Sequence, residues 1–353
     1  TYMVNNNNST ATRMVCAIIF GLFCFIFLYR YQGDILVFKQ FQASRGETHY
    51  EILLGALLVT VVLFLLQIGI YFITRLKGIF HAITYFPSLI ILTFLTQLDT
   101  FHISYRPQGN EWMWQLSLLI AIWGIVTYIA IQYQKVEIEI PHNGIFSQLT
   151  FINLFTLTIL ILIPCLIGNN DRIFHQRIHQ EYLIEQQQPD KAWQIGKYLN
   201  PENKNQVMIN AYCLMQMHHL GDSLFTLQLP MGMTTIMPNT DNGYPLVLNT
   251  QAIVNKTKHH RDYLLSKFLL KRDLDHFVEK LPKWYDLKKT LPQHYREAMV
   301  LYTAIKPKPS LHYVSEELEP KLIEFQQLRH KGHFKELKDK YEHTYWYYYY
   351  RSK

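Results

Sequence analysis

The sequence lacks every motif that would assign it a chemical activity. It contains no CxxC pair, no HExxH, no Walker phosphate loop and no GxGxxG. Ser223 follows Gly221 and Asp222 in GDSLF, which differs from the GxSxG turn that exposes a nucleophile. We therefore predict no catalytic residue, no metal site and no cofactor.

Charge is scarce in the first half of the chain. Residues 1–168 hold only eight of the 34 Lys and Arg and seven of the 27 Asp and Glu, so most of the net charge of +7 lies beyond them. There the two signs are interleaved, whereas nucleic-acid binding favours a denser patch of one sign. We predict a solvated helical surface and no nucleic-acid partner; a basic face against anionic lipid is the alternative.

Cysteine is also scarce, with Cys16, Cys24, Cys165 and Cys213 as the full set. Three fall in apolar runs and the fourth in an apolar helical pattern, so we predict buried thiols and no disulfide framework. No small-x-small cleavage site follows the apolar segment after Arg13, and we expect an uncleaved first span there.

Long apolar runs dominate the first half. About 20 residues at a rise of 1.5 Å match the ~30 Å hydrocarbon core of a bilayer. Five runs meet this criterion, at about 14–31, 52–74, 79–98, 112–133 and 148–168. We predict a disordered tail over 1–12, a transmembrane domain over 13–168 and a soluble domain over 169–353. Basic residues flank both sides of the spans, so the distribution of Lys and Arg does not fix the orientation.

The third run differs in carrying polar residues along its length, and it leads into Asp99 and His102. Polar groups in lipid are costly, so we expect this helix to face the bundle interior. One interpretation makes His81, Asp99 and His102 a site or proton path at the membrane. The other, which we favour, has Thr and Ser bonding to their own helix, Pro87 forming a kink and the charged end lying in the interface.

Beyond residue 168 the pattern is helical with polar breaks. We predict helices over 171–187, 190–199, 205–220, 253–271, 274–281, 292–305, 314–329 and 335–350, and a short extended piece in the earlier loop at 136–140. Helix pairs with Trp, Tyr and small residues at packing points and Pro at boundaries favour tetratricopeptide-like repeats. The predicted fold class is all-α, a five-span bundle followed by a helical-repeat domain.

Several side chains are candidates for function in this second domain. His175 and His179 lie four apart and can share a helix face, although two surface histidines explain them better. The neighbouring pairs His218-His219 and His259-His260 point in different directions and make poor chelates. Glu297 is expected to be an exposed helix residue. The candidate partner-binding residues are Trp193, Tyr212, Trp284, Tyr285, Tyr345 and Trp346; for the final aromatic run, partner or membrane contact and simple capping of the repeat stack are weighed equally.

The chain resembles a family in several segments: DKAWQIGKYL at 190–199, INAYCLMQMHHLGDSLF at 209–225, LPQHYREAMVLY at 291–302, Lys331-Gly332 and the aromatic end from Thr344 to Tyr349. These are similar to multi-pass membrane proteins of Bacteroidota that carry a tetratricopeptide-like C-terminal domain and have no known function. The resemblance implies an envelope location, in the bacterial inner membrane with the helical domain in the periplasm. It transfers no catalytic residue.

Three functions are compatible with these features. The first is a scaffold anchored in the lipid bilayer, whose helical-repeat domain binds another envelope protein or peptide. The second is a transferase or transporter subunit that acts on a lipid-linked substrate through the polar third span. The third is a subunit of a larger complex in which the spans form the interface. The oligomeric state is left open by the sequence.

Overall fold

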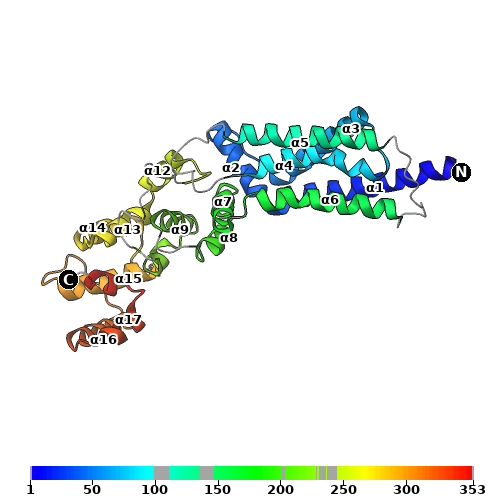
Figure 1. The fold of residues 1–353 in the computed structure, drawn as a ribbon. Coiled ribbons are helices and arrows are strands. Elements are labelled where there is room, and N and C mark those ends of the chain that lie inside the picture. Colours follow the sequence, from blue (N-terminus) through cyan, green and yellow to red (C-terminus); the bar gives the residue numbers. More distant parts are fainter. Residues whose placement is uncertain are drawn as a thin grey trace. The chain divides into compact units, whose positions relative to one another are not determined.

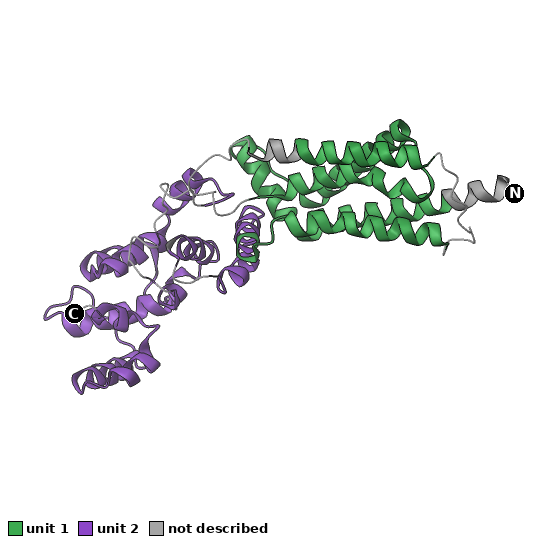
Figure 2. Ribbon diagram, in the orientation of Figure 1, with its two compact units in different colours: residues 1–175 green, residues 176–353 purple. Residues whose placement is uncertain are grey.

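The computed structural model describes residues 2–98, 111–134, 147–199, 203–227, 229, 236 and 245–351. Over these residues the regular secondary structure is helical throughout, without a strand, which confirms the all-α prediction. The chain divides into two compact units, Thr1–His175 and Gln176–Lys353 (Figure 2). This division lies close to the predicted domain boundary, and each unit is described by itself.

The first unit is a bundle of long helices (Figure 1). Among the described residues, four segments are long and apolar enough to cross a membrane, which indicates a membrane protein: Thr10–Tyr31, Ile52–Thr74, Gly78–Thr96 and Gln148–Ile167. The elements in order are α1 (Tyr2–Ile26), the π-helical η1 (Phe27–Tyr31), α2 (Gly33–Ser44), α3 (Ile52–Thr74), the 3-10 helix η2 (Gly78–Tyr85), α4 (Phe86–Thr96), α5 (Glu111–Tyr133), α6 (Gln148–Ile167) and the first residues of α7 (Arg172–Glu185).

The count of five spans is not confirmed. The helix α5 lies where the fourth span is predicted, but the apolar stretch among its described side chains, Ser117–Tyr133, is shorter than a full span. The first helix begins at Tyr2, so the structure has helix where the sequence predicts a disordered tail over 1–12. The predicted extended piece at 136–140 lies outside the described residues.

The outer faces of the spans are apolar and uncovered. On α3, Leu54, Val62 and Phe72 are more than half exposed, and on α6 the same holds for Phe151 and Phe155. Apolar surface of this extent is not stable in water, whereas a bilayer covers it at no cost. The α-helices meanwhile satisfy most of their backbone groups internally, as the hydrocarbon core requires.

The third span is the most buried of the four, with 50% of its residues inside the bundle against 17–33% in the others. This confirms that its polar side faces the interior. Ser88 donates to the Leu63 carbonyl at 2.9 Å, and Gln67 donates to the Thr84 hydroxyl at 3.0 Å. Pro87 lies in the first turn of α4, so the predicted kink takes the form of a change from 3-10 to α-helix before it.

The 3-10 segment is held by Asn153 of α6. Its side-chain oxygen accepts the Ala82 N–H at 2.9 Å, and its amide nitrogen donates to the Gly78 carbonyl, also at 2.9 Å. Asn153 is fully buried. A single amide therefore satisfies backbone groups that the irregular helix leaves open in an apolar bundle.

The predicted loop after the first span contains the helix α2, which the sequence analysis missed. Lys39 on this helix donates to the carbonyls of Phe94 and Leu95, at 3.2 and 2.9 Å. These are among the last carbonyls of α4, which have no partner within their own helix and carry the negative end of its dipole. Burial lowers the pKa of Lys39 to about 8.

The second unit packs short helices around one core (Figure 1). Its elements are the rest of α7, α8 (Pro189–Gly196), α9 (Lys204–Gln216), α10 (Leu220–Ser223), η3 (Leu224–Thr226), α12 (Thr250–Lys258), α13 (Arg261–Lys271), α14 (Leu274–Trp284), α15 (Gln293–Ile305), α16 (Leu318–His330), α17 (Phe334–Tyr341) and α18 (Tyr345–Tyr350). Two segments that the sequence predicts as single helices, 253–271 and 335–350, are each divided into two helices in the structure. Tetratricopeptide-like stacking is not confirmed.

A buried amide network joins the first three helices of this unit. Gln180 on α7 donates to Asn210 on α9 at 2.9 Å, and Gln206 donates to Gln180 at 2.6 Å. Asn210 in turn donates to the Gly196 carbonyl at the end of α8, at 3.0 Å. A Cβ at Gly196 would lie only 2.0 Å from the Gln180 amide, so glycine is required for the close approach.

Candidate binding site at the C-terminal helix

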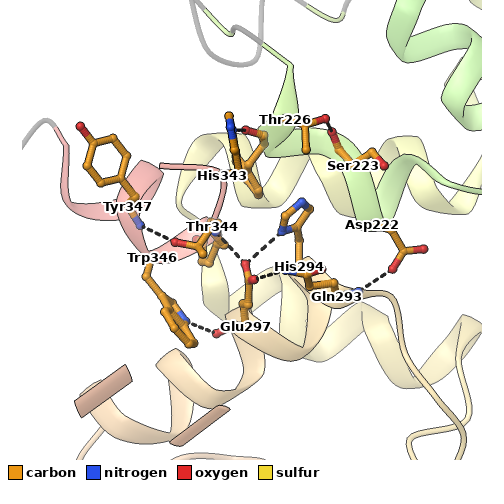
Figure 3. Close-up of polar contacts among 12 residues, drawn as sticks. Asp222, Ser223, Thr226, Gln293, His294, Glu297, His343, Thr344, Trp346 and Tyr347 are labelled. Carbon is orange, nitrogen blue, oxygen red and sulfur yellow. Dashed lines mark hydrogen bonds and ion pairs between the residues drawn. The ribbon is translucent and has the colours of Figure 1, made fainter. Parts of the chain in front are cut away.

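The aromatic C-terminal helix α18 is fixed to α15 by Glu297 (Figure 3). The Glu297 carboxylate accepts the backbone N–H of Tyr345 at 2.7 Å, and its backbone carbonyl accepts the indole N–H of Trp346 at 2.8 Å. All three residues are at most 1% exposed. Charge-assisted bonds of this kind, away from water, are the stronger class of hydrogen bond. Glu297 therefore holds the start of α18 in one position.

Neighbouring residues of α15 complete this contact. His294 Nδ1 lies 2.9 Å from one Glu297 oxygen, and the Gln293 amide donates to the other at 2.9 Å. The Gln293 backbone N–H is bound by Asp222 of α10 at 2.7 Å (Figure 3). Three segments distant in sequence thus meet around one buried carboxylate, which we call the Glu297 cluster: Asp222, Gln293, His294, Glu297, Tyr345 and Trp346.

The prediction that Glu297 is an exposed helix residue is wrong. Its position in Tyr295-Arg296-Glu297 gives no sign of burial, because its partners Tyr345 and Trp346 come from far along the chain. The one signal in the sequence is that the segment at 291–302 is among those that resemble the family of multi-pass membrane proteins.

A groove of about 510 Å³ lies between α16, α17 and α18. Aromatic and basic side chains line it, and none of its described lining residues is acidic: Phe325, Arg329, His330, Phe334, Leu337, Tyr347, Tyr350 and Arg351. Phe334 is 69% exposed, so its ring is available for contact at the groove. We call this feature the C-terminal groove.

Arg329 lies in the C-terminal groove, and no described lining residue is an acid that could form an ion pair with it. Its guanidinium lies 4.1 Å from the centroid of the Tyr350 ring, a cation–π contact. Burial raises the pKa of the Tyr350 phenol and Arg329 lowers it, with a net increase, so Tyr350 stays neutral and does not cancel the arginine charge. The groove therefore keeps the positive charges of Arg329 and Arg351 beside aromatic rings.

The predicted partner-binding residues divide by exposure. Tyr212, Tyr345 and Trp346 are buried in the core, while Trp193 and Tyr285 are partly buried against it and Trp284 is 36% exposed. Tyr345 and Trp346 are both bonded to Glu297, and the same helix carries Tyr347 and Tyr350 of the groove lining. Direct contact of these six residues with a partner stays a prediction.

The predicted polar site in the membrane is only partly described. His81 is 4% exposed, and its ring lies edge-on to those of Tyr71 and Tyr85, with centroids 5.5 and 5.7 Å apart. Asp99 and His102 lie outside the described residues. His81 is thus packed between two aromatic rings, and a chemical role for the three residues together stays a prediction.

Two of the histidine predictions change in the structure. His175 is a partly buried residue and not a surface one, since its Nδ1 lies 3.5 Å from Asp34. His218 and His260 come from different pairs, yet their rings stack with centroids 6.0 Å apart. The sequence gives no sign of this contact, because it joins the end of α9 to the start of α13. The thiol prediction agrees better: Cys16, Cys24 and Cys213 are buried and Cys165 is partly buried, all four free.

A family model described as a family of unknown function (DUF6057) matches residues 254–352. No curated protein and no solved structure matches the chain. The matched part runs from within α12 to the end of α18 and therefore contains both Glu297 and the C-terminal groove.

Proposed function

We propose that this chain is an integral membrane scaffold whose helical domain binds an acidic segment of another envelope protein in the C-terminal groove. The observation that carries the proposal is the lining of that groove, where Arg329, His330 and Arg351 lie beside the exposed ring of Phe334 and the partly buried rings of Tyr347 and Tyr350. Arginine is suited to this work because its planar guanidinium bonds a carboxylate through two parallel N–H groups.

The proposed contact has both an ionic and an apolar part. Phe334 and Tyr347 offer ring surface to an apolar or aromatic side chain of the bound segment. Tyrosine, tryptophan and arginine dominate the energy of protein interfaces because they bury large area at modest entropic cost. The Glu297 cluster holds the Tyr347 and Tyr350 wall in place before binding, which reduces the ordering cost of association.

Finer features predicted from the sequence belong to the same proposal. They are a fifth span at α5, tetratricopeptide-like stacking of the helical domain, membership of a Bacteroidota family, residence in the inner membrane and a periplasmic position of the helical domain. Attaching a groove to a membrane anchor confines its partner to the same membrane surface and raises the local concentration of the two proteins. The chain then works as one subunit of a larger assembly.

A photo-crosslinking experiment tests this function in the native membrane. A crosslinking amino acid at position 347 should capture one partner, and mass spectrometry of the crosslinked peptide should identify an acidic segment. Arg329→Glu should abolish the crosslink. Lys308→Glu, a charge reversal at an exposed loop position, should leave it unchanged. A crosslink to lipid only, or one that survives Arg329→Glu, would refute binding through this groove.

The second candidate, a transferase or transporter subunit, rests on His81, Asp99 and His102. In the described part of the third span the hydroxyl groups bond to backbone carbonyls, as Ser88 does with Leu63, and His81 packs between the rings of Tyr71 and Tyr85. These contacts support packing over chemistry, and we therefore rank the scaffold first. Joint substitution of Asp99 and His102 distinguishes the two functions, since it should abolish transport or transfer and leave the crosslink at 347 intact.

A further inference from the structure

Three side chains with metal-binding atoms meet on the second unit, away from the C-terminal groove. His218 follows α9, while His260 and Asp262 begin α13. One ligand atom from each of the three residues lies within 4.8 Å of the other two. Helix pairing over more than 40 residues of sequence creates this cluster, so no local motif announces it.

Asp262 has one oxygen committed and one open. Tyr285 donates a short hydrogen bond to Oδ1, and the Tyr295 hydroxyl lies 3.3 Å from the same atom. The other oxygen, Oδ2, has no hydrogen-bond partner among the described residues, although Asp262 is only 1% exposed. A buried carboxylate oxygen without a partner is costly.

The open oxygen faces an imidazole. His260 Nδ1 lies 3.9 Å from Asp262 Oδ2, too far for a hydrogen bond, and it also lacks a hydrogen-bond partner among the described residues. Two unsatisfied polar atoms that face each other across a space too wide for direct bonding are what a bridging cation would satisfy.

His218 occupies a backbone position that usually belongs to glycine. Its φ is +60°, and it ends α9 with bonds from the His218 and His219 N–H groups to the carbonyls of Met215 and Leu214. A histidine there accepts a left-handed conformation and points toward His260, with the two rings stacked at 6.0 Å.

We propose that His218, His260 and Asp262 bind a divalent transition metal, with Zn²⁺ as the best match. Two imidazoles and one carboxylate are a common three-ligand set for zinc, and the fourth position is then left to water or to a ligand from outside. In a tetrahedral site with bonds of about 2.0–2.1 Å, ligand atoms lie about 3.3 Å apart. The ligand atoms, which lie within 4.8 Å of one another, need to approach by up to about 1.5 Å to reach this spacing. His218, whose side chain is exposed, has room to move.

The two tyrosines complete the site from behind. Their bonds to Oδ1 orient the carboxylate so that Oδ2 is presented to the metal, as outer-shell donors do in zinc sites. Arg261, the nearest positive charge in the sequence, stacks on the Tyr285 ring at 4.8 Å from its centroid. The inference is independent of partner binding in the C-terminal groove.

Zinc titration of the full-length protein in detergent, purified with a tag free of histidine and stripped with EDTA, tests the site. Competition with a chromogenic chelator should show one Zn²⁺ per chain, and Co²⁺ in its place should give the visible absorption of a tetrahedral site. His218→Ala should weaken Zn²⁺ binding at least about tenfold. His219→Ala, its exposed neighbour, is the matched control and should change nothing.

Two results would overturn the assignment. One is the absence of stoichiometric Zn²⁺ in the unsubstituted protein, and the other is an equal effect of His218→Ala and His219→Ala. Because the His218 side chain is exposed, its truncation removes a ligand without opening the core. Tyr285→Phe gives a second reading that keeps all three ligands: it should weaken Zn²⁺ binding less than His218→Ala does.

Discussion

Replacing Glu297 by alanine should release α18 from the second unit. The substitution removes the acceptor of two buried donors, the Tyr345 N–H and His294 Nδ1. Only the Tyr345 N–H belongs to α18, since His294 lies on α15 with Glu297. An orphaned buried donor costs about 1–3 kcal/mol, so the loss for α18 is up to about 3 kcal/mol. Since 1.4 kcal/mol is tenfold in an equilibrium constant, opening of this helix should become roughly 10- to 100-fold more frequent. Amide hydrogen exchange over residues 344–350 in the full-length protein measures it.

The controls separate this effect from general destabilisation. Glu316→Ala removes a carboxylate whose side chain is exposed, and exchange should not change. Glu297→Gln keeps an oxygen for one donor but offers an NH₂ group to the other, so its effect should be intermediate. Unchanged protection of Tyr345 in Glu297→Ala would refute the argument that this carboxylate holds the helix. Protection lost equally across all helices of the unit would assign Glu297 to the core and not to α18.

Three further predictions concern other buried contacts. Burial raises the pKa of Glu181 to about 7 from 4.5. The stability that this carboxyl group contributes is therefore fully present below about pH 4.5 and is lost as the pH rises toward 7. Glu181→Gln should flatten the dependence of the melting temperature on pH in this range, and an unchanged slope would contradict it. Gly196→Ala should lower the free energy of unfolding by about 1–3 kcal/mol, because the added Cβ meets a buried amide. Gly124→Ala is the control and should be neutral, since nothing lies within 4 Å of its Cβ position. Equal effects of the two substitutions would count against close packing at Gly196. Asn153→Leu should expose the η2 amides to exchange, since it removes their bonds within the bundle, and retained protection would show that other groups satisfy them.

The membrane half of the fold was largely accessible from sequence. Runs without charge and of sufficient length predicted the spans at 52–74 and 148–168 to within a residue or so, because the thickness of the bilayer fixes both length and composition. The helix α2 was missed because it is short and mixed in polarity, and its reason to form is tertiary. Lys39 reaches the end of α4, and no local pattern reports that contact.

In the second unit the helices followed from periodicity, but their partners did not. Local pattern gives the face of α15 that carries Tyr295 and Ala298, both fully buried, and it assigns Glu297 to the surface because a carboxylate is seldom buried. The bond to Tyr345 comes from 48 residues away. His218 and His260 were likewise judged against their sequence neighbours, whereas the structure sets them against each other.

Buried carboxylates show most clearly the difference between what the local sequence pattern predicts and what the tertiary structure determines. Among the described residues three are buried, and each joins segments that are distant in sequence: Glu181 accepts the Val247 N–H, and Glu297 accepts that of Tyr345. Each of these two carboxylates thereby binds a backbone N–H group that has no partner in regular secondary structure. Asp262 differs, because it accepts from two tyrosine hydroxyls and turns its other oxygen toward His260. Glu181 also has one oxygen without a hydrogen-bond partner among the described residues, so the open oxygen alone does not distinguish Asp262. What distinguishes Asp262 is the pair of imidazoles beside it, because the ligand atoms of His218, His260 and Asp262 lie within 4.8 Å of one another. Asp262 is therefore the buried carboxylate of this unit that a bound cation would stabilise.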